Sequence, residues 1–399
     1  MIVVAVLFDR FGPYHIARLE AAANYMDVIP IEISGETSEY QWDKVESKKL
    51  PNRITLFRTK ESPLISPKEL DAAISKQLSL LKPDCVAING WSDRAALCAL
   101  YWCLENKIPA ILMSESAAQD ERRSFWKELL KKKIVEQFSS GLVGGERHAN
   151  YLVQLGMKRE NIFLGYDVVD NDYFFTGVTE VKKQEDFWRK KKELPENYFL
   201  VVSRFIEKKN LLFIIKVFNE YQKKAGSASW HLYILGNGIL EKQLLQLTND
   251  LGLNDIVHFE GFKQYDELPV YFGLAKALLH GSTTEQWGLV VNEAMASGLP
   301  VIISENCGCV PELVHNGVNG FSFNPYNQEQ LTSILYSFAN SNDNEIEEMG
   351  QQSLRIVSSF NADAFGKGML KAVETAKRKK NIQGLSLTMK LILRTLIHR

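Results

Sequence analysis

Two carboxylates in one stretch of the chain, Glu285 and Glu293, are the residues best placed to do chemistry. Glu285 falls in a polar loop after an apolar strand, and Glu293 lies eight residues further on, in a helix expected to begin near Gly288. The loop carboxylate can face a sugar while the helix carboxylate reaches a ribose diol. Backbone N–H groups at Gly288 and Leu289 open the same helix, whose dipole favours phosphate. With Trp287 between the two carboxylates, this stretch predicts a site for a nucleotide sugar.

A second cluster supplies positive charge at the end of another strand. An apolar run over residues 198–203 ends at Ser203, Arg204 follows at once, and Lys209 comes five residues after Arg204. Two cations beside a helix N-terminus suit a diphosphate, because they neutralise the charge that develops on a leaving nucleoside diphosphate. Taken alone, the same pair is also typical of a solvated surface.

A third cluster is the turn Gly236-Asn237-Gly238, which follows the strand expected over residues 231–235. Glycines at such a turn let the backbone approach a ligand closely. The turn does not match the dinucleotide fingerprint, because the third glycine and the acidic residue after it are absent. Contact with the nucleotide-sugar donor and a plain structural turn both remain open for Gly236 and Gly238.

In their order and spacing these clusters resemble glycosyltransferase family 4, whose members are retaining enzymes of the GT-B fold. The resemblance covers roughly residues 198–330, and three motifs of the family fall on the pairs Arg204/Lys209, Gly236/Gly238 and Glu285/Glu293. The resemblance implies that Arg204 and Lys209 bind the donor pyrophosphate. It also implies that Glu285 contacts the transferred sugar and that Glu293 binds the ribose.

The first half of the chain resembles the family less closely. Gly12 lies in the segment 11–15, where a Gly-containing loop of the family approaches the donor phosphates and the acceptor. Ser114 and Glu115 follow a predicted strand at the place where many members carry a His. We expect His15, Ser114 and Glu115 on the acceptor side of the site.

Two short motifs imitate metal sites. Asp170 and Asp172 form an Asp-x-Asp sequence, but they precede a linker rather than follow a nucleotide-binding strand, so a structural loop is the better interpretation. Cys307 and Cys309 resemble half of a zinc site, yet no second pair of ligands has zinc spacing. We therefore predict no metal and no resident cofactor, with the nucleoside diphosphate sugar as co-substrate.

The elements that must position these clusters alternate between short apolar runs and amphipathic segments, which is typical of parallel α/β sheets. We expect two facing Rossmann-like domains, the GT-B fold, with the site in the crevice outside the carboxyl ends of the strands. The expected boundaries are an acceptor-binding domain over 1–170, a charged linker over 171–197 and a nucleotide-sugar-binding domain over 198–360. The helices of 361–399 are expected to cross back to the first domain.

Length and composition agree with this organisation. The chain has 399 residues, which suits two domains, and its 45% hydrophobic and 24% charged residues are ordinary for a folded protein. Its 47 Lys and Arg residues balance 48 Asp and Glu residues, giving a net charge of -1, which argues against a nucleic-acid partner. Five cysteines without framework spacing favour a reducing cytoplasm. The apolar start of the chain indicates a buried strand rather than a signal peptide.

Basic segments that also carry large apolar residues occur at 122–133, 377–380 and 390–399. A solvated helix face explains each of them, and contact with an anionic membrane surface, where lipid-linked acceptors reside, is the alternative. The chain is thus expected in the cytoplasm, with association at the inner face of the membrane left open.

The sequence favours a metal-independent hexosyltransferase that uses a nucleoside diphosphate sugar, UDP-linked in the preferred reading, and a glycan, lipid-linked or small-molecule acceptor. Two alternatives remain. One is a nucleotide-sugar epimerase of the same two-domain shape, which would release nucleotide without an acceptor. The other is a non-catalytic nucleotide-sugar-binding subunit, against which the four charged motif residues argue.

Overall fold

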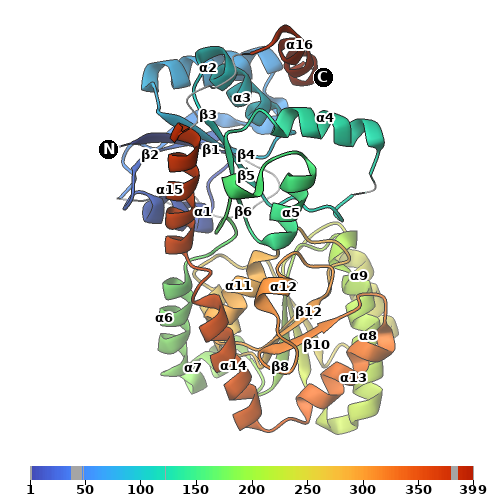
Figure 1. The fold of residues 1–399 in the computed structure, drawn as a ribbon. Helices are drawn as coiled ribbons and strands as arrows, with labels where there is room; N and C mark the ends of the chain where they lie inside the picture. Colours follow the sequence, from blue (N-terminus) through green and yellow to red (C-terminus); the bar gives the residue numbers. More distant parts are fainter. Residues whose placement is uncertain (1, 37–46, 48, 122, 379–384, 399) are drawn as a thin grey trace. The chain divides into compact units, whose positions relative to one another are not determined.

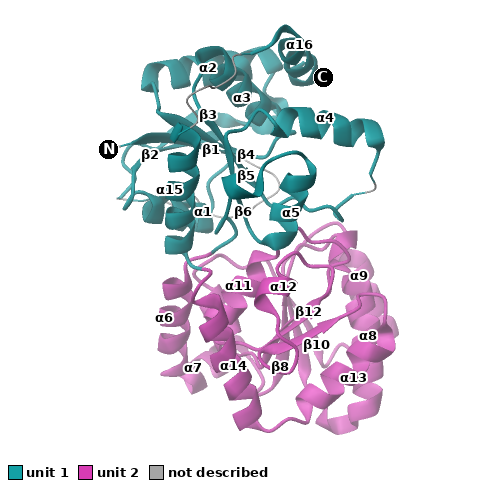
Figure 2. Cartoon of the chain, in the orientation of Figure 1, with its two compact units in different colours: residues 1–168, 361–399 teal, residues 169–360 magenta. Residues whose placement is uncertain are grey.

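The computed structural model describes residues 2–36, 47, 49–121, 123–378 and 385–398. The chain divides into two compact units (Figure 2): unit 1 comprises residues 1–168 and 361–399, and unit 2 comprises residues 169–360. The chain leaves unit 1 close to the boundary expected at residue 170, and residues 361–399 return to unit 1. None of the described helices is long and apolar enough to cross a bilayer.

Unit 1 is built on a seven-stranded parallel sheet with the strand order β3-β2-β1-β4-β5-β6-β7 (Figure 1). Its central strands are apolar on both faces, because helices cover the sheet on both sides. The strands are β1 (Val3–Phe8), β2 (Asp27–Glu36), β3 (Ile54–Glu61), β4 (Cys85–Asn89), β5 (Ala110–Ser114), β6 (Ser140–Val143) and β7 (Ile162–Leu164).

The helices of unit 1 form two layers. One layer shares a core with the sheet and consists of α2 (Pro67–Leu81), α3 (Arg94–Asn106), α4 (Phe125–Val135), α5 (Glu146–Gln154) and α16 (Leu387–Ile397). The other consists of α1 (Pro13–Ala22) and α15 (Ala362–Arg378), which lie side by side in Figure 1. Gly366 permits this close packing, because a Cβ there would lie 2.9 Å from the carbonyl oxygen of Ala21.

Unit 2 is built on a six-stranded parallel sheet with the order β10-β9-β8-β11-β12-β13. The chain moves outward from β8 to β9 and β10, then returns to the other side of β8 as β11. The adjacent strands β8 and β11 therefore flank the topological switch point, where loops diverge and ligands bind in open α/β sheets. The strands are β8 (Tyr198–Val202), β9 (His231–Leu235), β10 (Val257–Gly261), β11 (Ala277–His280), β12 (Val301–Ser304) and β13 (Gly320–Phe323).

Helices also cover both faces of this second sheet. One layer packs on an apolar core and consists of α8 (Leu211–Ala225), α9 (Glu241–Asp250) and α13 (Gln328–Ala339). The opposite layer contains α6 (Asn171–Lys182), α10 (Leu268–Leu274), α11 (Leu289–Ala296) and α14 (Asp343–Val357). The remaining helices are α7 (Glu185–Lys192) and the short α12 (Val310–Leu313).

The segment 171–197, expected as a linker, contains α6 and α7 and groups with unit 2. Asp170 is the N-cap of α6, and its carboxylate accepts a hydrogen bond from the Tyr173 N–H at 3.0 Å. This is the structural role expected for the Asp-x-Asp sequence. The side chain of Asn171 donates to the backbone carbonyl of Val357 at 2.9 Å, so the start of α6 is tied to the end of α14.

Gly320, at the start of β13, lies where two strands of this sheet approach each other closely. A Cβ there would lie 1.9 Å from the carbonyl oxygen of Val301 on β12, at a φ of +147°. Gly317, three residues earlier, also has a positive φ, of +73°, but meets nothing within 4 Å. We expect Gly317→Ala to cost about 1 kcal/mol of stability and Gly320→Ala at least about 3 kcal/mol, because only the second forces two strands apart. The two thermal unfolding midpoints measure the difference, and equal midpoints would contradict this packing.

Candidate functional site

The carboxylate of Glu285 lies at the centre of a polar cluster beyond the carboxyl ends of β8 and β11. Its Oε2 atom pairs with the ammonium of Lys209, which is 76 residues earlier in the chain. The same oxygen lies 3.3 Å from the Nε2 of His280 and accepts a hydrogen bond from the Ser282 hydroxyl at 3.1 Å. The switch point of unit 2 thus brings the second cation and the first carboxylate of the motifs into direct contact.

Charge in this cluster is set by burial and by the neighbouring groups. Burial opposes ionisation of Glu285, but the hydrogen bond from His280 and the charge of Lys209 outweigh it, so the pKa of Glu285 is well below its usual range. Burial lowers the pKa of His280 in spite of the hydrogen bond to Glu285. The cluster therefore holds an ionised Glu285 against Lys209, with a neutral imidazole beside it.

His280 and Ser282 were not among the residues predicted from the sequence. His280 ends β11, and its side chain is 2% exposed, while Ser282 lies two residues further on and is completely buried. Their hydrogen bond, between Oγ and Nε2, is 3.0 Å long. Residues i and i+2 of an extended chain point to the same side. That spacing, together with the polar character of a strand end, is a signal that could have identified them.

The glycines of the Gly236-Asn237-Gly238 turn are required by the chain itself. A Cβ on Gly236, whose φ is +132°, would lie 1.9 Å from the Ser203 carbonyl oxygen, and one on Gly238 would lie 2.6 Å from that of Phe205. The Phe205 N–H also donates to the Asn237 carbonyl at 2.7 Å. The close approach is thus between this turn and the segment that carries Ser203 and Arg204.

Ser203 and Arg204 lie directly after β8, where the predicted charge cluster begins. Both side chains are half-buried, and Lys209 ends the 3-10 turn Glu207–Lys209 that follows. The hydroxyl oxygen of Ser203 is buried and has no hydrogen-bond partner among the described residues. A buried unpaired hydroxyl is costly unless a ligand or water satisfies it, which makes Ser203 available for binding at this edge.

The second carboxylate, Glu293, lies inside α11 and is 8% exposed. Burial alone raises its pKa to about 8, so the carboxyl is protonated at neutral pH in the unliganded protein. Tyr265 interacts electrostatically with Glu293: burial raises the pKa of the Tyr265 hydroxyl, and the negative charge of Glu293, when it is ionised, raises it further. Gly288 caps the N-terminus of the same helix, so Leu289 supplies its first N–H.

The loop that carries Glu285 is held in place by Trp287 and by the segment Cys307-Gly308-Cys309. The indole of Trp287 is 1% exposed and donates to the Asn292 side chain at 2.8 Å, so only its backbone can reach a ligand. The Gly308 N–H donates to the Glu285 carbonyl at 2.9 Å, and the Cys309 N–H donates to the Trp287 carbonyl at 3.2 Å. The backbone of this segment therefore supports the backbone of the loop that carries Glu285. In the described part of the chain, no group of three or more His, Cys, Asp or Glu could hold a metal ion.

The predicted acceptor-side residues lie beyond the carboxyl ends of β1 and β5 in unit 1. His15 accepts a hydrogen bond from the Gly12 N–H at 3.0 Å, which makes Gly12 the cap of α1. Burial and the charge of Arg18 hold the pKa of His15 well below its usual value. Ser114 is 2% exposed, and its hydroxyl accepts from the Ser116 N–H at 3.2 Å.

Glu115 is linked to residues that the sequence did not single out. It shares a hydrogen bond with Asp167, and burial together with the charge of Glu115 raises the pKa of Asp167 far above its usual value. The buried guanidinium of Arg18 lies 3.8 Å from Asp167 and donates to the Val168 carbonyl at 2.9 Å. These contacts fix the end of unit 1 where the chain leaves for unit 2. Asp167 has no neighbouring motif that would have revealed this role.

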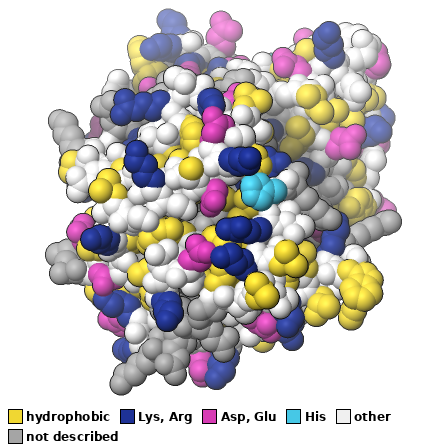
Figure 3. Space-filling view, turned by 90° about the horizontal axis from the view of Figure 1, so that it is seen from above, with side chains coloured by type: hydrophobic (Ala, Val, Ile, Leu, Met, Phe, Trp, Pro, Cys, Tyr) yellow, Lys and Arg dark blue, Asp and Glu magenta, His cyan; other side chains and the backbone are white. Residues whose placement is uncertain are grey.

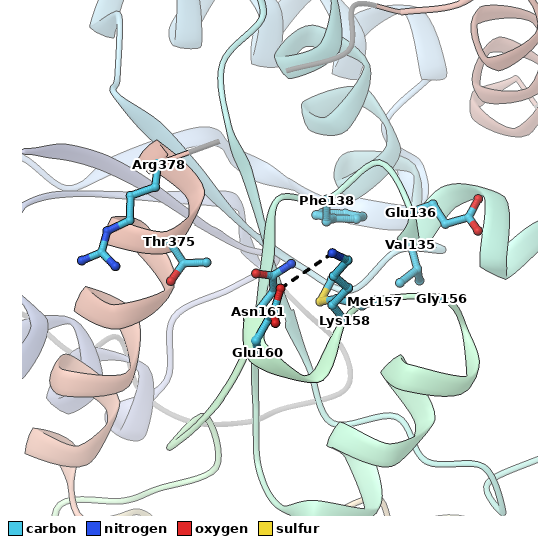
Figure 4. Close-up of a pocket in the computed structure, with 10 residues that line it drawn as sticks. All are labelled: Val135, Glu136, Phe138, Gly156, Met157, Lys158, Glu160, Asn161, Thr375 and Arg378. Carbon is cyan, nitrogen blue, oxygen red and sulfur yellow. Dashed lines mark ion pairs between the residues drawn. The ribbon is translucent and has the colours of Figure 1, made fainter. Parts of the chain in front are cut away.

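A cavity of about 490 Å³ in unit 1 lies away from all the predicted residues (Figure 4). Its lining joins the end of α4, the turn after α5 and the end of α15. Lys158 there pairs with Glu160 at 3.8 Å, as Figure 4 shows, and Arg378 pairs with Glu374 at 3.8 Å. Because none of the residues that line this cavity belongs to the predicted clusters, we do not take it as the candidate site.

The candidate residues of unit 2 lie in a segment of the chain that matches a known protein family. Residues 182–355 match the family model described as "Glycosyl transferases group 1". The chain is 36% identical over 138 residues to the O-antigen chain mannosyltransferase RfbU of Salmonella typhimurium, covering 34% of this chain and 37% of that protein. It is 34% identical over 142 residues to the amylovoran biosynthesis glycosyltransferase AmsK of Erwinia amylovora, covering 34% of each. The aligned stretches thus span only about a third of these curated relatives.

Solved structures resemble almost the whole chain. A structure of Anabaena HepE in complex with UDP has a TM-score of 0.70 at 17% identity, covering 92% of this chain and 98% of that one. A glycosyltransferase from Rickettsia africae has a TM-score of 0.72 at 15% identity, covering 95% and 99%. At such identities the likeness concerns the fold. Together with the two parallel sheets, it confirms the expected GT-B fold.

Because folding raises the pKa of Glu293 above that of an unfolded Glu, the protonated carboxyl favours the folded state. This stabilisation is complete below the unfolded pKa near 4.5 and is lost as the pH rises through about 8. We expect the nucleotide-free protein to lose roughly 5 kcal/mol of stability across this window. Glu293→Gln should remove most of that slope, whereas Glu329→Gln, at an exposed site on α13, should keep it. Unfolding midpoints measured across the window test this, and an unchanged slope in Glu293→Gln would contradict the buried, protonated state.

Proposed function

We propose that the chain is a retaining glycosyltransferase that moves a hexosyl group from a nucleoside diphosphate sugar to an acceptor hydroxyl. The observation that carries the proposal is the contact between Lys209 and Glu285 at the switch point of unit 2, with Ser203 and Arg204 at the same edge. This edge lies within residues 182–355, which match the glycosyl transferase model.

We assign the donor contacts as follows. Arg204 and Lys209 bind the diphosphate, assisted by the N–H groups that open α11 at Gly288 and Leu289. Glu293 holds the ribose diol, and its protonated carboxyl can both donate and accept hydrogen bonds. Since HepE was solved with UDP and with UDP-glucose, we propose a UDP-linked donor here.

In the proposed reaction the acceptor oxygen bonds to the anomeric carbon while the bond from that carbon to the diphosphate oxygen breaks. Attack occurs on the face from which the diphosphate departs, so the configuration is retained. The departing phosphate oxygen takes the proton of the acceptor hydroxyl. Lys209 and Arg204 neutralise the charge on the leaving group, and the ionised Glu285 positions the sugar through its hydroxyls. No covalent intermediate with the protein is needed.

The acceptor is proposed to be a glycan, a lipid-linked sugar or a small molecule. Relatives named for amylovoran and O-antigen synthesis favour a polysaccharide pathway. His15, Ser114 and Glu115 remain the residues we propose for acceptor contacts. Their side chains are held by hydrogen bonds within unit 1, which favours a preformed binding surface.

The epimerase and the non-catalytic subunit are less favoured, because the curated relatives that match are named as transferases. A screen of nucleotide sugars by thermal shift selects the donor, since a bound ligand raises the unfolding temperature. Turnover of that donor with and without an acceptor pool then separates the three functions. A transferase consumes the donor only when the acceptor is present, an epimerase changes the donor without an acceptor, and a binding subunit leaves the donor unchanged in both assays.

We expect transfer to persist in EDTA, because the two cations Arg204 and Lys209 can neutralise the diphosphate without a metal ion. The transfer rate with and without EDTA measures this, and loss of activity that Mg²⁺ restores would contradict metal independence.

The phosphate assignment predicts the effect of removing either cation. Arg204→Ala and Lys209→Ala should each lower transfer at least about tenfold, because a lost charged contact to the leaving group costs roughly 1.5–3 kcal/mol. Lys216→Ala removes an exposed cation of α8 and is the matched control, which should keep full activity. Steady-state rates test the assignment, with thermal unfolding to verify the fold of Lys209→Ala, since that change leaves Glu285 unpaired. Rates within twofold of wild type for both variants would refute it.

The two glutamates should differ in the step that they affect. Glu293→Gln should weaken binding of the bare nucleoside diphosphate, because its carboxyl is assigned to the ribose. Glu285→Gln removes the ion-pair partner of Lys209 but should lower that affinity less than Glu293→Gln does, and should lower kcat, because the contact of Glu285 with the sugar matters only when the sugar is present. Calorimetry with the nucleoside diphosphate and steady-state kinetics measure the two effects. Equal losses of nucleotide affinity would contradict this division of roles.

A further inference from the structure

Helix α4 of unit 1 presents an apolar face to solvent. Phe125 is 74% exposed, Trp126 is 75% exposed and Leu129 is 42% exposed. Residues 125 and 129 are four apart and therefore lie on one side of the helix, with residue 126 next to them and residues 132 and 133 one turn further along. Lys132 and Lys133 are both exposed. The solvent face of α4 thus combines two aromatic rings, a leucine and two lysines, and we call these five residues the α4 face.

The opposite side of the helix is firmly held, so α4 cannot turn to bury this face. Ile134 and Val135 are buried in the core of unit 1. Glu128 pairs with Arg123 at 2.9 Å and with Lys131 at 3.1 Å, and it accepts a hydrogen bond from the Tyr151 hydroxyl of α5 at 3.1 Å.

The charge around the α4 face is strongly positive, although the whole chain has a net charge of -1. The segment 123–133 carries five cations and one carboxylate, Glu128, which already pairs with two of them. Lys127, Lys132 and Lys133 are exposed and make no ion pair within the described residues. Figure 3 shows apolar side chains interspersed with Lys and Arg side chains on the surface seen from above. Arg122, in the same basic segment, lies outside the described residues, as do Lys379, Lys380 and Arg399 of the two C-terminal segments.

We propose that the α4 face docks unit 1 onto an anionic lipid surface. Aromatic rings are favoured at the boundary between headgroups and acyl chains, and lysines beside them are attracted by lipid phosphates. A protein partner fits less well, because the cores of protein interfaces are depleted in lysine. The proposal goes beyond the assigned reaction and does not depend on it, since it concerns binding in the absence of donor and acceptor.

Helix α7 in unit 2 offers a matched comparison. It also combines aromatic and basic residues, but Lys191 lies over the Trp188 ring at 4.9 Å and over the Phe187 ring at 5.4 Å. Two carboxylates, Glu185 and Asp186, lie in its first turn. Its aromatic rings are thus covered by its own cation and its positive charge is partly compensated, so we expect α7 to contribute little to lipid binding.

The test is co-sedimentation of the full chain with phosphatidylcholine vesicles that contain or lack phosphatidylglycerol. Wild type should bind only the anionic vesicles and should be released by salt, because the attraction is partly electrostatic. Phe125→Ser/Trp126→Ser and Lys132→Gln/Lys133→Gln should each lower the partition coefficient at least about tenfold, as expected for lost interfacial contacts. Phe187→Ser/Lys190→Gln on α7 should bind as wild type. All substituted residues are exposed or half-exposed, so the unfolding temperatures should stay unchanged.

Three results would overturn the proposal: wild type that does not bind anionic vesicles, α4 variants that bind as well as wild type, or an α7 variant that loses binding equally. Light scattering covers a further outcome. If wild type is an oligomer that Phe125→Ser/Trp126→Ser dissociates, and vesicles do not bind, the α4 face joins copies of this chain and the lipid proposal fails. Nucleoside diphosphate binding, measured on the same samples without vesicles, reports separately on the assigned reaction.

Discussion

The ion pair between Lys209 and Glu285 is the constraint on which the candidate site depends. Both side chains are little exposed, at 12% and 13%, so each charge would be costly to bury without the other. The pair holds the turn after β8 against the loop after β11, which are the two loops that diverge at the switch point. Burial keeps His280 neutral, and the charge of Lys209 adds to this effect. Burial opposes ionisation of Glu285, but the hydrogen bond from His280 and the charge of Lys209 outweigh it and keep Glu285 ionised.

Other hydrogen bonds around this pair hold the loops that follow β8 and β11 in place. The backbone of Gly308 and Cys309 bonds to that of Glu285 and Trp287, and the buried indole of Trp287 is fixed by Asn292 in α11. The glycines at 236 and 238 let their turn pass against the segment 203–205. Preorganisation of this kind lowers the cost of placing charges before a ligand arrives. Trp287, Gly236 and Gly238 were expected to contact the donor, but in the structure their side chains or Cα positions are needed for packing within unit 2.

Unit 1 shows a second way of holding polar residues. Arg18, Asp167 and Glu115 form a network at the end of the unit, in which burial and the charge of Glu115 raise the pKa of Asp167. Such a network is stable only when its members are satisfied together. Helix α4 in the same unit differs from this network. Its inner side packs in the core, but the large apolar side chains of the α4 face are exposed to solvent.

The sequence by itself determined the parallel α/β character of both units, the strand ends after which Arg204, Lys209 and Glu285 follow, and the helix that carries Glu293. These follow from local properties: apolar runs predict buried strands, and polar residues after them mark the carboxyl edge. The strands expected over 198–203 and 231–235 agree with β8 and β9 within a residue. The strands β2, β3, β6, β7 and β13 were not predicted, because their runs are short or broken by polar residues.

Only the tertiary structure decided which of these residues meet. The contact between Lys209 and Glu285 depends on the order of strands in the sheet, which no local pattern encodes. The roles of His280, Ser282 and Asp167 depend on neighbours far away in the chain, and the burial of Trp287 depends on Asn292. The protonation of Glu293 depends on the packing around α11, because desolvation is a property of everything that surrounds a group. Residue types and spacing thus gave the chemistry available at each strand end, while packing decided its charge and its partners.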